Sequence, residues 1–219
     1  MSTIYFRNQG ETSHEEVSDL HALPTVDKTE RPSFANVPYA ADYIWRLADL
    51  GRIYVASDAD QNDTVTGQTS FAATTPSFML RVPVNAVAIP MFLNLSQTGT
   101  VAGAAIDVII ELDDIDRYSS GGTAETTFSP RKTNPVTPRC SVYSTPTAAA
   151  GYGVRIWGTT IGQDVSPAEG AVQGPFWKPE MPYFLEGPAS LLIYTYAGTT
   201  APTWFWSFGW AEFDPKTGL

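Results

Sequence analysis

The sequence predicts an all-β fold, an antiparallel β-sandwich of jelly-roll or Greek-key type with an extended N-terminal arm. The strongest observation is the alternation in residues 203–213, where bulky aromatic side chains occupy every second position. The second is composition: only 16% of the residues are charged, while Gly, Pro and aromatic residues are plentiful, which favours strands joined by tight turns. The third is a series of about eight strand-like segments separated by loops, which is typical of a sandwich.

The alternation in residues 203–213 indicates a strand with one bulky face. That face carries Trp204, Trp206, Phe208 and Trp210, here called the aromatic ladder. Burying these rings would contribute on the order of 10 kcal/mol gross at about 25 cal/mol per Å². An exposed platform that stacks on sugar rings would need flanking hydrogen-bonding groups, and the opposite, mostly small face carries only Ser207. We therefore interpret the ladder as a wall of the core.

Residues 1–38 contain too few apolar residues to build a core, which predicts an extended arm separate from a β-sandwich domain over residues 39–219. An isolated polar arm of this kind would be disordered. Its scattered apolar residues could instead anchor it on a neighbouring surface. These residues are our candidate partner-binding positions: Ile4, Tyr5, Phe6, Leu20, Leu23, Val26 and Phe34.

The β region is expected to begin after a short connector. Residues 43–51 permit one or two helical turns that Gly51 could end, and residues 53–57 form the first strand candidate. Residues 58–63 carry oxygen-bearing side chains at alternate positions, as a calcium loop does. An EF-hand needs Gly where Asp63 stands and Glu where Thr69 stands, so we interpret this segment as an acidic turn and predict no metal site.

Residues 77–82, 87–95 and 105–113 are successive strand candidates, which we interpret as an antiparallel meander. Pro90 indicates a bulge or an edge position in the second strand. In the third strand, Ile106, Val108, Ile110 and Leu112 share one face, and Asp107, Ile109, Glu111 and Asp113 share the other. That pattern predicts a half-buried strand with a wet outer face.

The remaining elements are strands at residues 140–145, 154–160, 189–196 and 203–213, and a loop over residues 163–180 pinned by Phe176 and Trp177. Residues 113–138 form the longest irregular passage, and loops of such length are usually functional or mobile. An acidic turn opens this passage, and a basic group follows, consisting of Arg131, Lys132 and Arg139. In a self-assembling protein the two charged groups could meet across a subunit boundary.

Net charge and cysteine usage narrow the class of partner. A formal charge of −10 without clustered Lys and Arg argues against nucleic acid as a partner, because phosphate binding requires such clusters. The single cysteine, Cys140, forms no intrachain disulfide, which suits folding in the cytosol, and we expect it to be buried. No signal segment and no run of about 18 apolar residues occurs, so neither secretion nor a membrane partner is predicted.

The sequence offers little for catalysis. Both histidines, His14 and His21, lie in the arm, which argues against a histidine-dependent metal enzyme and against a nucleophile activated by histidine. Glu111 and Glu186 are candidates in principle for the paired carboxylates of a glycoside hydrolase, although an acidic sandwich offers such pairs by chance. We predict no enzymatic activity, no catalytic residue and no cofactor.

The chain resembles structural proteins of tailed-bacteriophage particles, especially jelly-roll cement or decoration proteins and minor head proteins. The resemblance covers most of the chain and rests on the polar arm, the acidic and cysteine-poor β body, and the strands of residues 77–113 followed by the segment at residues 118–122 (YSSGG). It implies a protein made in the host cytoplasm that binds the capsid exterior as a homotrimer and stabilises contacts between major capsid protein subunits.

The alternative is a carbohydrate-binding fibre or spike domain for host attachment. It requires tryptophan side chains that are exposed to sugar rings. The candidates are Trp45, Trp157, Trp177 and part of the aromatic ladder.

Overall fold

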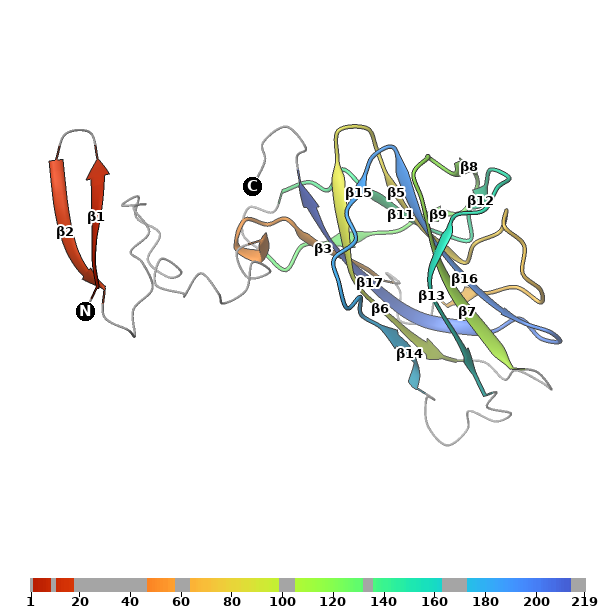
Figure 1. Cartoon of the computed structure of the whole chain (residues 1–219). Helices are drawn as coiled ribbons and strands as arrows, with labels where there is room; N and C mark the ends of the chain where they lie inside the picture. The colour runs from red at the N-terminus through yellow and green to blue at the C-terminus, as the bar shows by residue number, and fades with distance from the viewer. Residues whose placement is uncertain are drawn as a thin grey trace. The chain divides into compact units, whose positions relative to one another are not determined.

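The computed structural model describes residues 2–8, 11–17, 47–57, 64–98, 105–131, 136–162 and 173–213 (Figure 1). The chain divides into two compact units, residues 1–46 and residues 47–219. The described residues form strands and one helical turn at residues 47–49, so the all-β class is confirmed. The predicted calcium-like turn, residues 58–63, lies outside the described residues.

The first unit contains an antiparallel hairpin of β1 (Ser2–Asn8) and β2 (Glu11–Val17). Ile4, Tyr5 and Phe6 belong to β1, where the sequence indicates a strand. The partner strand β2 is polar (ETSHEEV) and has no apolar alternation, so sequence patterning does not reveal it. The other candidate anchors, Leu20, Leu23, Val26 and Phe34, lie outside the described residues.

The second unit is a sandwich of two antiparallel sheets. The first sheet contains β3 (Ile53–Ser57), β4 (Val65–Thr66), β6 (Val87–Gln97), β10 (Thr127–Phe128), β14 (Gln173–Trp177), β15 (Leu185–Glu186) and β17 (Thr203–Phe213). Its strand order is β10-β3-β17-β6-β14, with β15 paired to β6 and β4 paired to β17. We call it the seven-stranded sheet.

The second sheet contains β5 (Phe78–Val82), β7 (Ile106–Asp113), β9 (Thr123–Ala124), β11 (Ser141–Ser144), β13 (Val154–Ile161) and β16 (Ala189–Ala197). Its order is β13-β7-β16-β5-β11-β9, and we call it the six-stranded sheet. Beside the two sheets, β8 (Tyr118–Ser120) pairs with β12 (Thr147–Ala148).

The aromatic ladder of β17 lies in the core between the two sheets, as its alternation predicts. All four ladder residues are buried in one apolar cluster with inward-facing residues of the six-stranded sheet, including Phe78, Ile110 and Ile193. The rings of Phe78 and Trp206 lie 4.7 Å apart between centroids, across the two layers. The sandwich therefore closes on the face that the sequence marks as apolar.

The predicted meander is wrong, because consecutive strands alternate between the sheets. β5 and β7 lie in the six-stranded sheet, each paired with β16, whereas β6 pairs with β17. β16 is buried along almost its whole length, and such a strand is stable at a position between two neighbours. The turn at residues 83–86, with Asn85 at φ 66°, therefore carries the chain from one sheet to the other.

Two local predictions have different outcomes. The bulge expected near Pro90 is confirmed, because the register between β6 and β17 shifts where Trp210 pairs with Pro90. The loop predicted over residues 163–180 instead contains β14, which places Trp177 in the core and leaves Phe176 exposed. Period two explains this, because adjacent residues of a strand point to opposite faces.

Candidate functional site

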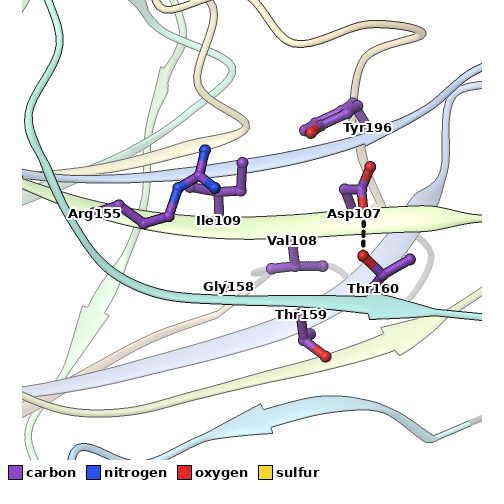
Figure 2. Close-up of a pocket in the computed structure, with 8 residues that line it drawn as sticks. All are labelled: Asp107, Val108, Ile109, Arg155, Gly158, Thr159, Thr160 and Tyr196. Carbon is purple, nitrogen blue, oxygen red and sulfur yellow. Dashed lines mark hydrogen bonds between the residues drawn. The ribbon is translucent and has the colours of Figure 1, made fainter.

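A groove of about 320 Å³ opens on the outer face of the six-stranded sheet (Figure 2). It is lined by Asp107, Val108 and Ile109 of β7, Arg155, Gly158, Thr159 and Thr160 of β13, and Tyr196 of β16. Strand register explains the row at its polar end, because Asp107 pairs with Thr160 on one side and with Tyr196 on the other. Residues directly opposite each other on antiparallel strands share a face, so these three side chains meet.

Hydrogen bonding and charge define this polar end. The Thr160 hydroxyl donates to Asp107 Oδ1 at 2.5 Å, which holds the carboxylate in place. Burial, and then the nearby Asp107 carboxylate, raises the pKa of the Tyr196 hydroxyl, while the Arg155 guanidinium opposes the rise. The groove therefore carries an anchored anion and a cation within electrostatic reach of one phenol.

A β-bulge places Arg155 on the groove side of β13. Arg155 pairs with Glu111 and Trp157 pairs with Ile110, so Ile156 is the extra residue. In regular pairing without the bulge, Arg155 would lie opposite Leu112 and share the face of Trp157. Figure 2 shows Arg155 at the opposite end of the groove from Tyr196, with Gly158 between Arg155 and Thr160 along β13.

Apolar side chains surround the groove, which corrects the expectation of a wet outer face on β7. Ile109 is buried there in a cluster with Met79, Leu192 and Tyr194, against which Tyr196 also packs. Glu111, on the same face, is buried as well and accepts a hydrogen bond from the Gly153 backbone N–H at 3.3 Å. The pattern fails because side chains outside β7 pack around Ile109, whereas Asp107 stays partly exposed at the polar end of the groove.

An aromatic row continues from the groove over this outer face. The Phe71 ring contacts Tyr196 edge-on, with centroids 5.9 Å apart, and stacks with Tyr152 at 6.5 Å. The Tyr152 side chain is 77% exposed. The groove therefore has a polar floor at one end and an accessible aromatic surface beside it.

The two carboxylates suggested by the sequence are placed in different sheets. Glu111 is buried on β7 of the six-stranded sheet, and Glu186 is exposed on β15 of the seven-stranded sheet. Neither belongs to the residues that line the groove.

The tryptophans required by the carbohydrate alternative do not form exposed platforms. Trp177 and the aromatic ladder are buried in the core, and Trp157 is half-buried against it. Trp45 lies outside the described residues. An aromatic sugar-binding surface on the described sandwich would therefore have to use other rings.

The acidic turn after β7 has partners within the chain. Asp113 forms an ion pair with the buried Arg117 at 2.7 Å, and Asp116 pairs with Arg81 at 2.6 Å. The Arg117 guanidinium also donates to the backbone carbonyls of Ala149 and Gly151, which joins two loops. These carboxylates stabilise the sandwich.

The predicted basic group is likewise engaged within the chain. Arg131 donates to the backbone carbonyl of Asp49, and Arg139 donates to that of Asn85 at 2.7 Å. Lys132 lies outside the described residues. An intersubunit pairing of the acidic and basic groups would have to compete with these internal contacts.

Within the described part of the chain, no group of three His, Cys, Asp or Glu side chains is placed to hold a metal ion. Among the same residues, no helix has the length and apolarity that crossing a bilayer requires. No protein-family model, curated protein or solved structure matches the chain.

Proposed function

We propose that this protein is a non-enzymatic structural protein of a bacteriophage virion, a cement or decoration protein with a jelly-roll body. It binds the capsid exterior and stabilises contacts between major capsid protein subunits. The observation that carries the proposal is the division of the chain into two compact units, residues 1–46 and 47–219. The second unit has its own closed core and can act as a rigid body, while the first can act as an attachment element.

The hairpin supplies a physical reason for attachment. A two-stranded sheet is marginally stable alone, and among the strands that the structure describes β1 and β2 pair only with each other. Their free edges can extend a sheet of a partner, with backbone hydrogen bonds providing affinity and the β1 residues Ile4, Tyr5 and Phe6 providing apolar contacts. Assembly as a homotrimer would multiply such weak contacts, because the second and third attachments become intramolecular.

The first test is the composition of purified particles. Virions are banded in a density gradient, washed, and analysed by quantitative mass spectrometry. We expect this chain at a fixed ratio to the major capsid protein, and we expect it to be accessible to protease added outside the particle. Its absence from washed particles, or its protection inside them, would contradict the proposal.

The second test separates the attachment element from the sandwich. Stripped particles are mixed with the full chain, with a chain lacking residues 1–38, and with the triple variant Ile4→Ser, Tyr5→Ser, Phe6→Ser, and co-sedimentation is measured. Both altered chains should lose at least about tenfold in affinity, which corresponds to about 1.4 kcal/mol. The control Phe176→Ser, an exposed aromatic of the sandwich, should co-sediment normally.

A further inference from the structure

We propose that the groove on the six-stranded sheet binds a neutral saccharide. In this assignment the Asp107 carboxylate accepts hydrogen bonds from sugar hydroxyls, the Arg155 guanidinium donates to them, and the Tyr196 ring forms an apolar wall. The site goes beyond the particle-binding function, which depends on the N-terminal unit. Its volume of about 320 Å³ lies at the lower end of the range for small-molecule sites.

Gly158 is the first argument, because its lack of a side chain leaves the groove open. Its backbone is not in the left-handed region. A Cβ at this position would lie 3.5 Å from the Val108 carbonyl oxygen, 3.8 Å from Arg155 Cδ and 4.0 Å from Ile109 Cγ1, which are ordinary contact distances. Glycine weakens a strand and often marks a close approach by a ligand. At position 158 neither backbone strain nor packing requires glycine. The open volume of the groove is therefore the feature that Gly158 preserves.

The polar groups form the second argument. A carboxylate has about four acceptor positions, and at Asp107 the hydroxyl of Thr160 fixes one oxygen and leaves acceptor capacity for a ligand. The Arg155 side chain is exposed, and within the described residues no hydrogen bond or ion pair engages its guanidinium. A sugar hydroxyl both donates and accepts, so hydroxyls at the two ends of a bound saccharide can use the anion at one end of the groove and the cation at the other.

The aromatic row is the third argument. The C–H faces of a sugar ring are apolar and pack against aromatic rings. The hydroxyl groups at the edge of the sugar ring remain available for hydrogen bonds. Tyr196 lies beside Asp107 at the end of the groove (Figure 2), and Phe71 links it to the exposed Tyr152. A second sugar unit could extend over this row. We therefore expect a trisaccharide to bind more tightly than a monosaccharide of the same sugar.

Charge favours a neutral ligand over an anionic one. The chain carries a formal charge of −10, and Asp107 lies within the groove itself. An anion would gain from Arg155 but would be repelled by the carboxylate. Inorganic phosphate is therefore the probe that separates the two chemistries.

The experiment is an NMR titration of the full-length, ¹⁵N-labelled chain. The probes are maltotriose, cellotriose, mannotriose and a galactose trisaccharide, each with its monosaccharide, and sodium phosphate in parallel. We expect at least one trisaccharide to give saturable shifts confined to the groove strands β7, β13 and β16. The expected dissociation constant is about 0.1–10 mM, because a shallow polar site gains little from burial.

Two variants and a control test the site. Gly158→Val should fill the groove and raise the dissociation constant at least about tenfold with an unchanged melting temperature, and Asp107→Asn should weaken binding at least about fivefold. The control variant is Phe176→Ala, which removes an exposed aromatic side chain of the other sheet. It should bind the saccharide as tightly as the unsubstituted chain does.

Three results would overturn the assignment. The first is the lack of saturable shifts with every trisaccharide at about 20 mM, which exceeds the dissociation constants expected for such a site. The second is saccharide binding that persists in Gly158→Val. The third is saturable binding of phosphate alone, lost in Arg155→Ala, which would identify an anion site.

Discussion

Glu212, a residue of β17, is a buried carboxylate that joins two distant segments. It is 4% exposed and accepts three N–H donors: the backbone amides of Arg139 at 2.8 Å and Cys140 at 3.0 Å, and the indole Nε1 of Trp210 at 2.8 Å. Hydrogen bonds to a charged acceptor are stronger than neutral ones, and donors left unsatisfied in the interior are costly. Glu212 therefore fixes the segment that precedes β11 against β17.

Substitution of Glu212 measures that contribution. Glu212→Ala should lower the free energy of unfolding by about 3–5 kcal/mol, because the three donors lose their acceptor, and Glu212→Gln should cost less because one carbonyl oxygen remains. Urea unfolding followed by tryptophan fluorescence gives both values. Glu186→Gln, at an exposed carboxylate, is the matched control and should change stability by less than about 0.5 kcal/mol. Equal effects of Glu212→Ala and Glu186→Gln would contradict this account.

The raised pKa of the Tyr54 hydroxyl predicts that the folded protein loses stability at alkaline pH. Burial, and then the nearby Glu212 carboxylate, raises the pKa of the Tyr54 hydroxyl from 10.0 to about 12. The folded state then holds this proton more tightly than the unfolded state does, so the stabilisation is complete below pH 10 and declines as the pH rises toward 12. Tyr54→Phe should show a smaller decline in urea unfolding between pH 9 and 12. Identical declines in both proteins would contradict the assignment.

Residue-scale predictability depends on whether a partner lies nearby in the sequence. The predicted burial of Cys140 is confirmed. It could be predicted because a free thiol behaves as a small apolar side chain. Glu212 and Arg117 are missed, because charged residues are expected at the surface unless paired, and their partners become visible only in three dimensions. Glu212 and Cys140 are 72 positions apart in the chain.

At the scale of elements, alternation predicts strands well and register poorly. The bounds of β17 and the inward face of β7 follow from period two. The bulge of β13 and the pairing of Asp107 with Tyr196 depend on which strands are neighbours, and no local pattern encodes that choice. The strands are therefore predictable from the sequence, whereas the groove that they form is not.

Gly153, which directly precedes β13, and Gly158, which lies within it, give a matched test of packing. A Cβ at Gly153 would lie 2.5 Å from the Leu112 carbonyl oxygen, which is backbone and cannot move freely, whereas Gly158 has ordinary distances. Gly153→Ala should destabilise the protein by about 1–3 kcal/mol, while Gly158→Ala should be neutral or stabilising by up to about 1 kcal/mol. Thermal unfolding should show a drop of about 2–12 °C for Gly153→Ala alone. A similar drop for Gly158→Ala would show that Gly158 is needed for the fold.

For the whole molecule, composition and alternation are sufficient for the all-β class but not for the topology. The apolar faces of β7 and β17 are readable from the sequence, and the two faces meet in one core as expected. The sheet that each strand joins depends on how buried strands such as β16 fit between their neighbours. Adjacency in the sequence does not contain this information, and it therefore predicts a meander where the chain in fact crosses between the sheets. The polar strand β2 is not predicted for a related reason, because its sequence, ETSHEEV, has no apolar alternation.

The position of the core predicts where the chain can be shortened. The chain divides into its two compact units between Arg46 and Leu47, and Leu47, the first residue of the second unit, is buried with Ile53, Ile89 and Ala211. Removal of residues 1–38 should therefore leave the free energy of unfolding within about 0.5 kcal/mol of the full chain. Removal of residues 1–49 should cost about 2–4 kcal/mol, because it also deletes the buried Leu47 side chain and the backbone carbonyl that bonds Arg52.

Urea unfolding of the two shortened chains decides between two descriptions of the N-terminal segment. If the shorter deletion lowers stability as much as the longer one, the segment is part of the sandwich fold and its loss would disturb any function. If only the longer deletion does so, the sandwich folds without residues 1–38. A loss of particle binding on deletion of residues 1–38 would then measure attachment alone, because the sandwich itself is unchanged.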